Sequence, residues 1–227
     1  MRILHIDCSP RKSSHSRKMS AGILARLRAL VPDASVTRRD LGREPLPHAR
    51  DDYAETLATP QNLAAADAAA THLSEQLIQE LEAADVLVIG TPMNNFTVPS
   101  VLKAWIDQVL RVGRTMGTTP TGEKTGLLQD RPVYIGIAAG GVFTGERAKQ
   151  PDFLTPYLKA AFDCIGLKSL HFLTLQATAF RDEDQLAQER DALIAGLDVS
   201  GRRSFQATPN ATSSNTPVMV VTPFQPS

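Results

Sequence analysis

The sequence has few cysteines, no net charge and no long hydrophobic run, and each of these absences excludes a class of protein. Its two cysteines, Cys8 and Cys164, lie far apart, so they cannot build a disulfide framework, and neither has the neighbours of a zinc site. No apolar run is long enough to cross a membrane, and the N-terminal run is too short for a signal peptide. We therefore expect a cytoplasmic protein with no membrane partner and no metal.

Charge and composition exclude further classes of protein. The 24 basic and 24 acidic side chains give a formal net charge of zero, which offers no support for nucleic-acid binding and argues against a strongly acidic electron carrier. Hydrophobic residues make up 42% of the chain, an ordinary share for a soluble domain. A chain of 227 residues is long enough for one α/β domain with a single core.

Short apolar runs alternate with longer amphipathic segments along most of the chain. Strands are predicted at residues 3–6, 35–39, 86–90, 133–138 and 169–173. Helices are predicted at residues 14–30, 61–81, 99–112, 151–164 and 182–197. This alternation indicates a parallel sheet with helices on both faces.

Three segments fall outside this alternation. Residues 41–60 have no clear period and predict a long surface loop, and the Gly- and Thr-rich residues 113–130 predict an excursion such as a hairpin. Residues 200–227 form a Pro/Ser/Thr-rich tail with no charged residue from Ser204 onward. Such a tail cannot build a core, so we expect it to be disordered or, as the alternative, docked through residues 218–221.

The loop between the first strand and the first helix has the chemistry of an anion site. It carries Ser9, Ser14, His15 and Ser16, so hydroxyls meet free helix N–H groups at the positive end of the helix dipole. It lacks the Gly-x-Gly-x-x-Gly pattern, which disfavours a pyrophosphate and suits a terminal phosphomonoester. The alternative is that a serine of this loop only caps the helix.

Two further loops leave the carboxyl ends of predicted strands, where open parallel sheets bind ligands. Their candidate residues are Met93, Asn94, Asn95 and Phe96, and Ala138, Ala139, Gly140 and Gly141. Adjacent asparagines can expose backbone N–H groups, Met and Phe offer flat apolar contact, and paired glycines let the backbone approach a ligand. The alternatives are an ordinary loop before a helix that starts with Pro99, and an ordinary glycine turn.

No motif in the chain points to nucleotide hydrolysis or to covalent catalysis. Residues 117–125 nearly match a P-loop, but Glu123 stands where Lys should follow the glycine, and the segment follows a helix instead of a strand. No nucleophile stands beside a base, and only His15 of the five histidines lies in a proposed site. We therefore expect no catalytic side chain of the protein's own.

Taken together, these segments resemble the FMN-dependent NADH:quinone oxidoreductases and azoreductases of the flavodoxin-like superfamily. The match covers about residues 1–199 and is most specific at residues 84–96, 102–107, 113–116, 155–158 and 165–166. The resemblance implies a flavodoxin-like, doubly wound α/β domain over residues 1–199, with a five-stranded parallel sheet of order 2-1-3-4-5. It also implies FMN as cofactor, NADH or NADPH as co-substrate, and a homodimer with the active site at its interface.

The resemblance also assigns roles to the candidate residues. The FMN phosphate would contact Ser9 and residues 14–16, and the flavin ring would contact residues 93–96 and 138–141. NAD(P)H would give a hydride to the flavin and leave before a quinone or azo acceptor enters the same space, which is ping-pong chemistry that the cofactor performs. Asn94 stands where the family usually has Tyr, and Ala138 and Ala139 replace a more polar pair. The alternatives are an electron-transfer flavoprotein without its own NAD(P)H turnover and a flavin-free nucleotide sensor.

Overall fold

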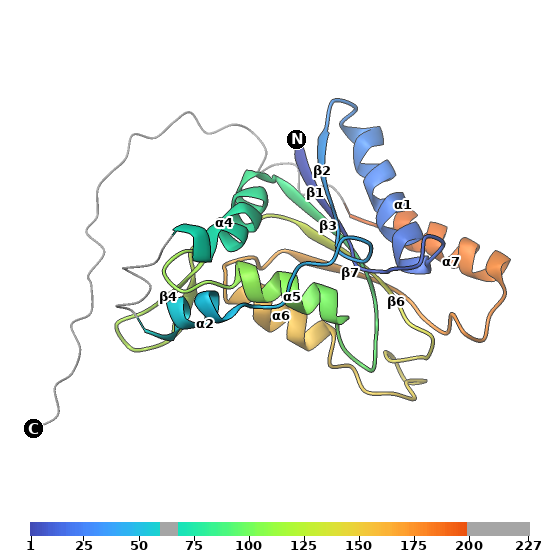
Figure 1. The fold of residues 1–227 in the computed structure, drawn as a ribbon. Coiled ribbons are helices and arrows are strands. Elements are labelled where there is room, and N and C mark those ends of the chain that lie inside the picture. The colour runs from blue at the N-terminus through green and yellow to red at the C-terminus, as the bar shows by residue number, and fades with distance from the viewer. Residues whose placement is uncertain (60–67, 199–227) are drawn as a thin grey trace, which may run out of the picture. The chain divides into compact units, whose positions relative to one another are not determined.

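The structure, a computed structural model, describes residues 1–59 and 68–198 and contains a five-stranded parallel sheet of order β2-β1-β3-β6-β7 (Figure 1). The strands are β1 (Arg2–Asp7), β2 (Ser35–Asp40), β3 (Val86–Pro92), β6 (Val133–Ala138) and β7 (Leu170–Leu175). The helices are α1 (His15–Leu30), α2 (Asp51–Ala58), α4 (Ala68–Ala83), α5 (Ser100–Val109), α6 (Thr155–Asp163) and α7 (Glu183–Ala195). Numbered among themselves, the sheet strands run 2-1-3-4-5, which confirms the predicted flavodoxin-like order.

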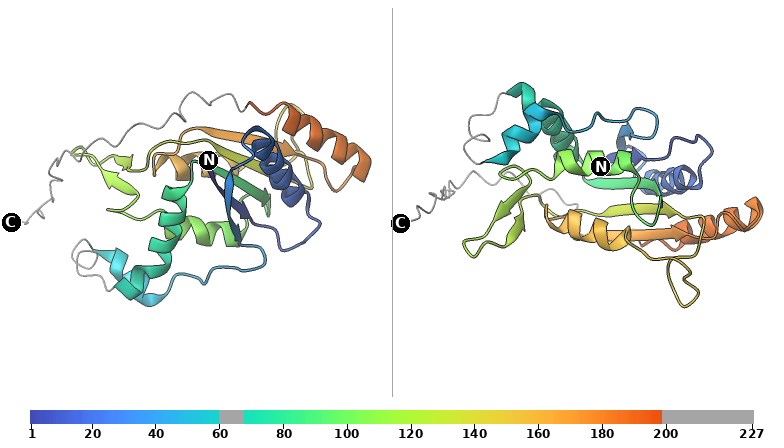
Figure 2. Two further views of the ribbon diagram at one scale, coloured as in Figure 1. Left: turned by 90° about the horizontal axis from the view of Figure 1, so that it is seen from above. Right: turned by 60° about the horizontal axis from the view of Figure 1, so that its bottom comes forward.

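The sheet is covered by helices on both of its faces. The helices α4, α5 and α6 pack on one face, and α1 and α7 pack on the other (Figure 2). The central strands β3 and β6 are buried almost throughout, which explains their nearly continuous apolar sequences. On the first face Trp105 of α5 and Phe162 of α6 are fully buried, with ring centroids 6.4 Å apart.

Two strand glycines allow α1 to lie close to the sheet. A Cβ added at Gly136 would stand 2.7 Å from the Cβ of Met19, and one added at Gly90 would stand 2.7 Å from the carbonyl oxygen of Ser16. Real Cβ atoms do not approach other atoms this closely, so both positions require glycine for this packing. The first turn of α1 therefore rests directly on the carboxyl end of β3.

Of two predicted elements outside the main sheet, the structure confirms one and contradicts the other. The excursion after α5 is a hairpin, as predicted, formed by the antiparallel strands β4 (Met116–Thr118) and β5 (Lys124–Gly126). The prediction that residues 41–60 form only a loop is wrong, because α2 lies there. Only Tyr53 and Thr56 of α2 are buried, which is too little to give the sequence a visible period.

The remaining differences concern the ends of predicted helices. α6 begins at Thr155 and not at residue 151, because the Asp152 carboxylate accepts the N–H groups of Leu154 and Thr155 at 2.9 Å each. α4 begins at Ala68 within the described part, and the start of its predicted helix and the 200–227 tail lie outside the described residues. Among the described helices, none has the length and apolar character that a membrane span requires.

Candidate functional site

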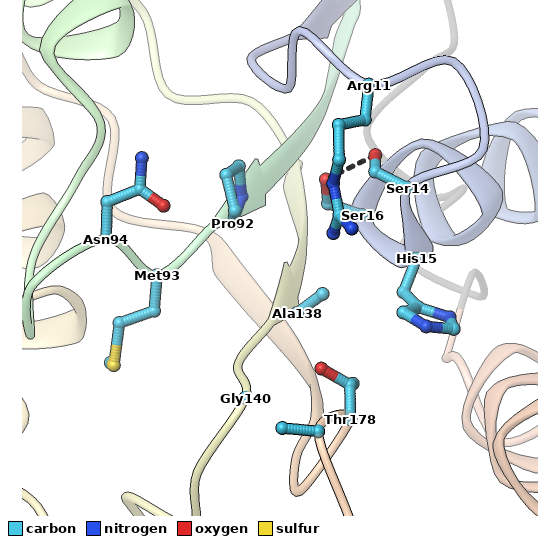
Figure 3. Close-up of a pocket in the computed structure, with 11 residues that line it drawn as sticks. Arg11, Ser14, His15, Ser16, Pro92, Met93, Asn94, Ala138, Gly140 and Thr178 are labelled. Atoms are coloured by element: carbon cyan, nitrogen blue, oxygen red, sulfur yellow. Dashed lines mark hydrogen bonds between the residues drawn. The ribbon is translucent and has the colours of Figure 1, made fainter. Parts of the chain in front are cut away.

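A pocket of about 300 Å³ lies at the carboxyl ends of the central strands (Figure 3). After β1 the chain turns to α1 on one face, and after β3 it turns to α5 on the other, so the pocket sits at the switch point of the sheet. Four segments at the carboxyl ends of β1, β3, β6 and β7 form its walls. They contribute Arg11, Ser14, His15 and Ser16, then Pro92, Met93 and Asn94, then Ala138 and Gly140, then Thr178 and Ala179.

The serines of the first loop both cap α1 and line the pocket. Ser14 is the N-cap of α1, and its hydroxyl accepts the N–H of Arg17 at 3.3 Å. The hydroxyls of Ser14 and Ser16 lie 3.2 Å apart, and both side chains are buried. Of the two capping candidates, Ser13 and Ser14, it is Ser14 that caps the helix, and this is compatible with an anion site because Ser14 and Ser16 also line the pocket.

Ser9 holds the backbone of this loop, and its predicted contact with the FMN phosphate stays a prediction. Its side chain is buried but is not part of the pocket wall, and its hydroxyl accepts the Arg11 N–H at 3.4 Å. Its carbonyl oxygen accepts hydrogen bonds from Nε and Nη2 of Arg17 at 2.8 and 2.6 Å. Ser9 thus anchors the loop by its backbone.

Arg17 connects this anchor to the end of β2. Its guanidinium forms an ion pair with Asp40 and lies 3.4 Å from a carboxylate oxygen of Asp7, while its side chain is only 14% exposed. The hydrogen bond from Arg17 holds the pKa of the Asp40 carboxyl below its usual value. The paired charges therefore fix the loop backbone in place before any ligand binds.

His15 brings to the pocket a buried polar atom without a partner in the described part of the chain. Its Nδ1 atom is buried and has no hydrogen-bond partner among the described residues, although the ring lines the pocket. Partial burial lowers the pKa of the imidazole, which favours the neutral ring with its one donor and one acceptor. An orphaned polar atom of this kind fits a site built for a polar ligand.

The loop after β3 presents two of its four candidate residues to the pocket. Met93 and Asn94 line the wall, while Asn95 and Phe96 form a tight turn with φ angles of 47° and 71°. Backbone bonds of 2.9 and 3.0 Å between Asn94 and Thr97 close this turn. A Phe in the left-handed region is strained, and such strain is characteristic of ligand-binding loops.

The loops after β6 and β7 are fastened to each other. The N–H groups of Ala177, Thr178 and Ala179 donate to the carbonyls of residues 139–141 at 3.0 to 3.3 Å. These bonds bring Thr178 and Ala179 into the wall beside Ala138 and Gly140, while Ala139 and Gly141 lie outside it.

The structure thus groups the predicted site residues into two sets. Those that line the pocket are Ser14, His15, Ser16, Met93, Asn94, Ala138 and Gly140, and those that flank it are Ser9, Asn95, Phe96, Ala139 and Gly141. The sequence argument missed Arg11, Pro92, Thr178 and Ala179 as wall residues. Arg11 could have been found, because it is a cation inside the proposed anion loop, whereas Thr178 and Ala179 follow a strand in a segment without glycine.

The sheet order and the pocket at its switch point define a flavodoxin-like α/β protein. Comparison with known proteins agrees, because the family model of the Flavodoxin-like fold matches residues 1–197. The chain is 47% identical over 182 residues to FMN-dependent NADH:quinone oxidoreductase 4 of Pseudomonas fluorescens, covering 80% of this chain and 86% of that protein. It is 44% identical over 200 residues to FMN-dependent NADH:quinone oxidoreductase 5 of Burkholderia lata, covering 85% and 95%. The chain belongs to the family of these FMN-dependent NADH:quinone oxidoreductases.

Solved structures agree on the fold. An azoreductase of Bacillus anthracis str. Sterne superposes with a TM-score of 0.74 at 23% identity, covering 86% of this chain and 95% of that one. An FMN-dependent NADH-azoreductase of Bacillus anthracis str. Ames Ancestor in complex with FMN gives a TM-score of 0.70 at 24% identity, covering 85% and 95%. The family and the fold expected from the sequence are thus confirmed.

Proposed function

We propose that this chain is an FMN-dependent NADH oxidoreductase that reduces quinones. The observation that carries the proposal is the pocket at the switch point, where buried serine hydroxyls and the start of α1 form an anion site in a chain 47% identical to an enzyme of that name. Ser14 and Ser16 would hold the FMN phosphate together with the free N–H groups of α1. The walls at Met93, Asn94, Ala138 and Gly140 would hold the ring.

Bound FMN would supply the relay of a hydride from the nicotinamide to the acceptor. The chain's own residues would position the cofactor and the two substrates. We propose that NADH and the acceptor use this pocket in turn, in a ping-pong order. The test is steady-state kinetics with NADH and a small benzoquinone: parallel double-reciprocal lines support the order, and lines that intersect contradict it.

Azo compounds are a second class of acceptor, supported by the azoreductases among the structural neighbours. Asn94 lies in the wall where the family usually has Tyr, so the pocket has less stacking surface and more room there. We therefore propose that small quinones are better acceptors than bulky planar dyes. NADPH is proposed as an alternative donor, to be compared with NADH under the same conditions.

A homodimer with the site at its interface is also proposed. Two large apolar side chains near the pocket support it, because Phe96 is 44% exposed and Phe153 is 61% exposed. They are neighbours, since the Phe153 N–H donates to the Phe96 carbonyl at 3.0 Å. Burial of this pair by a second subunit would remove apolar surface from water and cover the open side of the pocket.

The dimer is tested by sedimentation of the flavin-loaded protein. Twice the chain mass of 24.6 kDa supports it, and a fully active species of the single-chain mass contradicts it. A cytoplasmic location belongs to the same proposal, and fractionation of the host cell tests it.

A further inference from the structure

We propose that Arg11 is the cationic partner of the FMN phosphate, so that a guanidinium completes the site of hydroxyls and helix amides. The inference rests on the proposed FMN function. It adds a residue that determines the affinity for the phosphate and the salt dependence of that affinity. Arg11 lies in the loop between β1 and α1, and its side chain lines the pocket with Ser14 and Ser16. In Figure 3 the side chain extends beside these two hydroxyls.

The loop backbone holds Arg11 in this place. Its N–H donates to the Ser9 hydroxyl at 3.4 Å, and its carbonyl accepts the Ser14 N–H at 3.3 Å. Arg17 in turn fixes the Ser9 carbonyl through two hydrogen bonds. The Cα of Arg11 is therefore attached to a rigid frame, although its side chain is exposed.

The pairing of nearby cations leaves Arg11 available to a ligand, and unlike its neighbour Lys12 it lines the pocket. Arg17 is paired with Asp40, Lys18 with Glu183 and Arg190 with Asp191. Arg11 has no carboxylate partner within residues 1–59 and 68–198. Its positive charge also helps to lower the pKa of His15, which places the guanidinium within electrostatic reach of the pocket wall.

A phosphate monoester fits this free guanidinium. It carries nearly two negative charges at pH 7, whereas a helix N-terminus supplies only about half a positive charge. A guanidinium supplies a full charge and a planar fork of donors that matches phosphate oxygens. The pocket thus offers the charge that the hydroxyls of Ser14 and Ser16 cannot.

The test compares Arg11→Gln with a matched control, Lys12→Gln. Lys12 is the adjacent exposed cation and is not part of the pocket wall, so it reports what a general loss of charge does. The full chain is stripped of flavin and titrated with FMN and with riboflavin, at low and at high salt, with quenching of flavin fluorescence as the readout. Riboflavin lacks the phosphate and so isolates its contribution.

We expect Arg11→Gln to raise the FMN dissociation constant by about tenfold to a hundredfold, as the loss of a charged hydrogen bond does. Its affinity for riboflavin should be unchanged, and its FMN affinity should fall less with added salt than that of the wild type. Arg11→Lys should keep the salt dependence and part of the affinity. Lys12→Gln should behave like the wild type.

Three results would overturn the assignment of Arg11. One is an unchanged FMN preference in Arg11→Gln, and another is an equal effect of Lys12→Gln. The third is an Arg11→Gln variant whose FMN affinity is unchanged and whose KM rises for NADPH but not for NADH, since Arg11 would then bind the 2′-phosphate of NADPH. In each of these cases FMN binding itself survives. If the wild type binds FMN no better than riboflavin, both the inference and the proposed function fail.

Discussion

Replacement of Arg17 by Gln tests whether a partly buried ion pair holds the anion loop in place. The guanidinium donates twice to the Ser9 carbonyl and pairs with Asp40, with only 14% of its side chain exposed. Removing one member of a buried ion pair destabilises a protein by about 3–5 kcal/mol, and the partial exposure of Asp40 places this case near the lower end. We expect the free energy of unfolding to fall by about 3 kcal/mol and the melting temperature by roughly 6–12 °C.

The matched control is Lys18→Gln on the same helix. Lys18 pairs with Glu183 at the surface, where the two side chains are 36% and 58% exposed, so its loss should change stability by less than about 1 kcal/mol. Both variants are measured by urea unfolding at pH 7 against the wild type. If Arg17→Gln is no less stable than Lys18→Gln, the charged anchor does not hold the loop and the argument is refuted.

The same pair predicts how stability depends on pH. The Arg17 hydrogen bond lowers the folded-state pKa of Asp40, while the unfolded value is about 3.9. The contribution of the pair is therefore fully present above about pH 4 and is lost as the pH falls through the lowered folded-state value. The stability difference between wild type and Arg17→Gln should shrink on acidification from pH 7 to pH 3, and a constant difference would contradict the pairing.

Three further predictions address the pocket and its support. The double change Ser14→Ala with Ser16→Ala should weaken FMN binding by about 1.5–3 kcal/mol per hydrogen bond and leave riboflavin binding unchanged; equal affinity of the wild type for both flavins would sink this assignment. Asn94→Tyr should raise kcat/KM for a planar azo dye, relative to a small quinone, by roughly tenfold or less, and an unchanged ratio would show that position 94 does not shape the acceptor space. Gly136→Ala should destabilise the fold by about 1–3 kcal/mol in urea unfolding, because its Cβ would stand 2.7 Å from that of Met19, and an unchanged midpoint would refute this packing.

The sequence predicts the sheet well because its central strands are buried on both faces. β3 and β6 must be apolar almost throughout, so their runs stand out. The strand assignment also locates the candidate site loops, because ligands in such sheets bind where strands end. In contrast, α2 buries only two of its side chains, Tyr53 and Thr56. Two buried positions are too few to give its sequence a periodic hydrophobic pattern.

The details of the site depend on contacts that no local pattern encodes. Thr178 joins the wall because its N–H bonds to the carbonyl of Ala139, a residue far away in sequence. The Ser9 carbonyl anchors the loop because Arg17 reaches it from α1. The positive φ of Phe96 is likewise invisible in the sequence, since Phe rarely adopts it and the bond to Phe153 stabilises it from outside the turn.

The central claim is that this protein passes a hydride from NADH through bound FMN to a quinone. The most direct test is the visible absorbance spectrum of the protein, recorded under anaerobic conditions. The purified protein is loaded with FMN and treated with NADH, then with a small benzoquinone, and dithionite serves as the control that every bound flavin can be reduced. We expect NADH to bleach the flavin band and the quinone to restore it. A band that dithionite bleaches but NADH leaves intact would contradict the claim and identify the chain as an electron-transfer flavoprotein without NADH turnover.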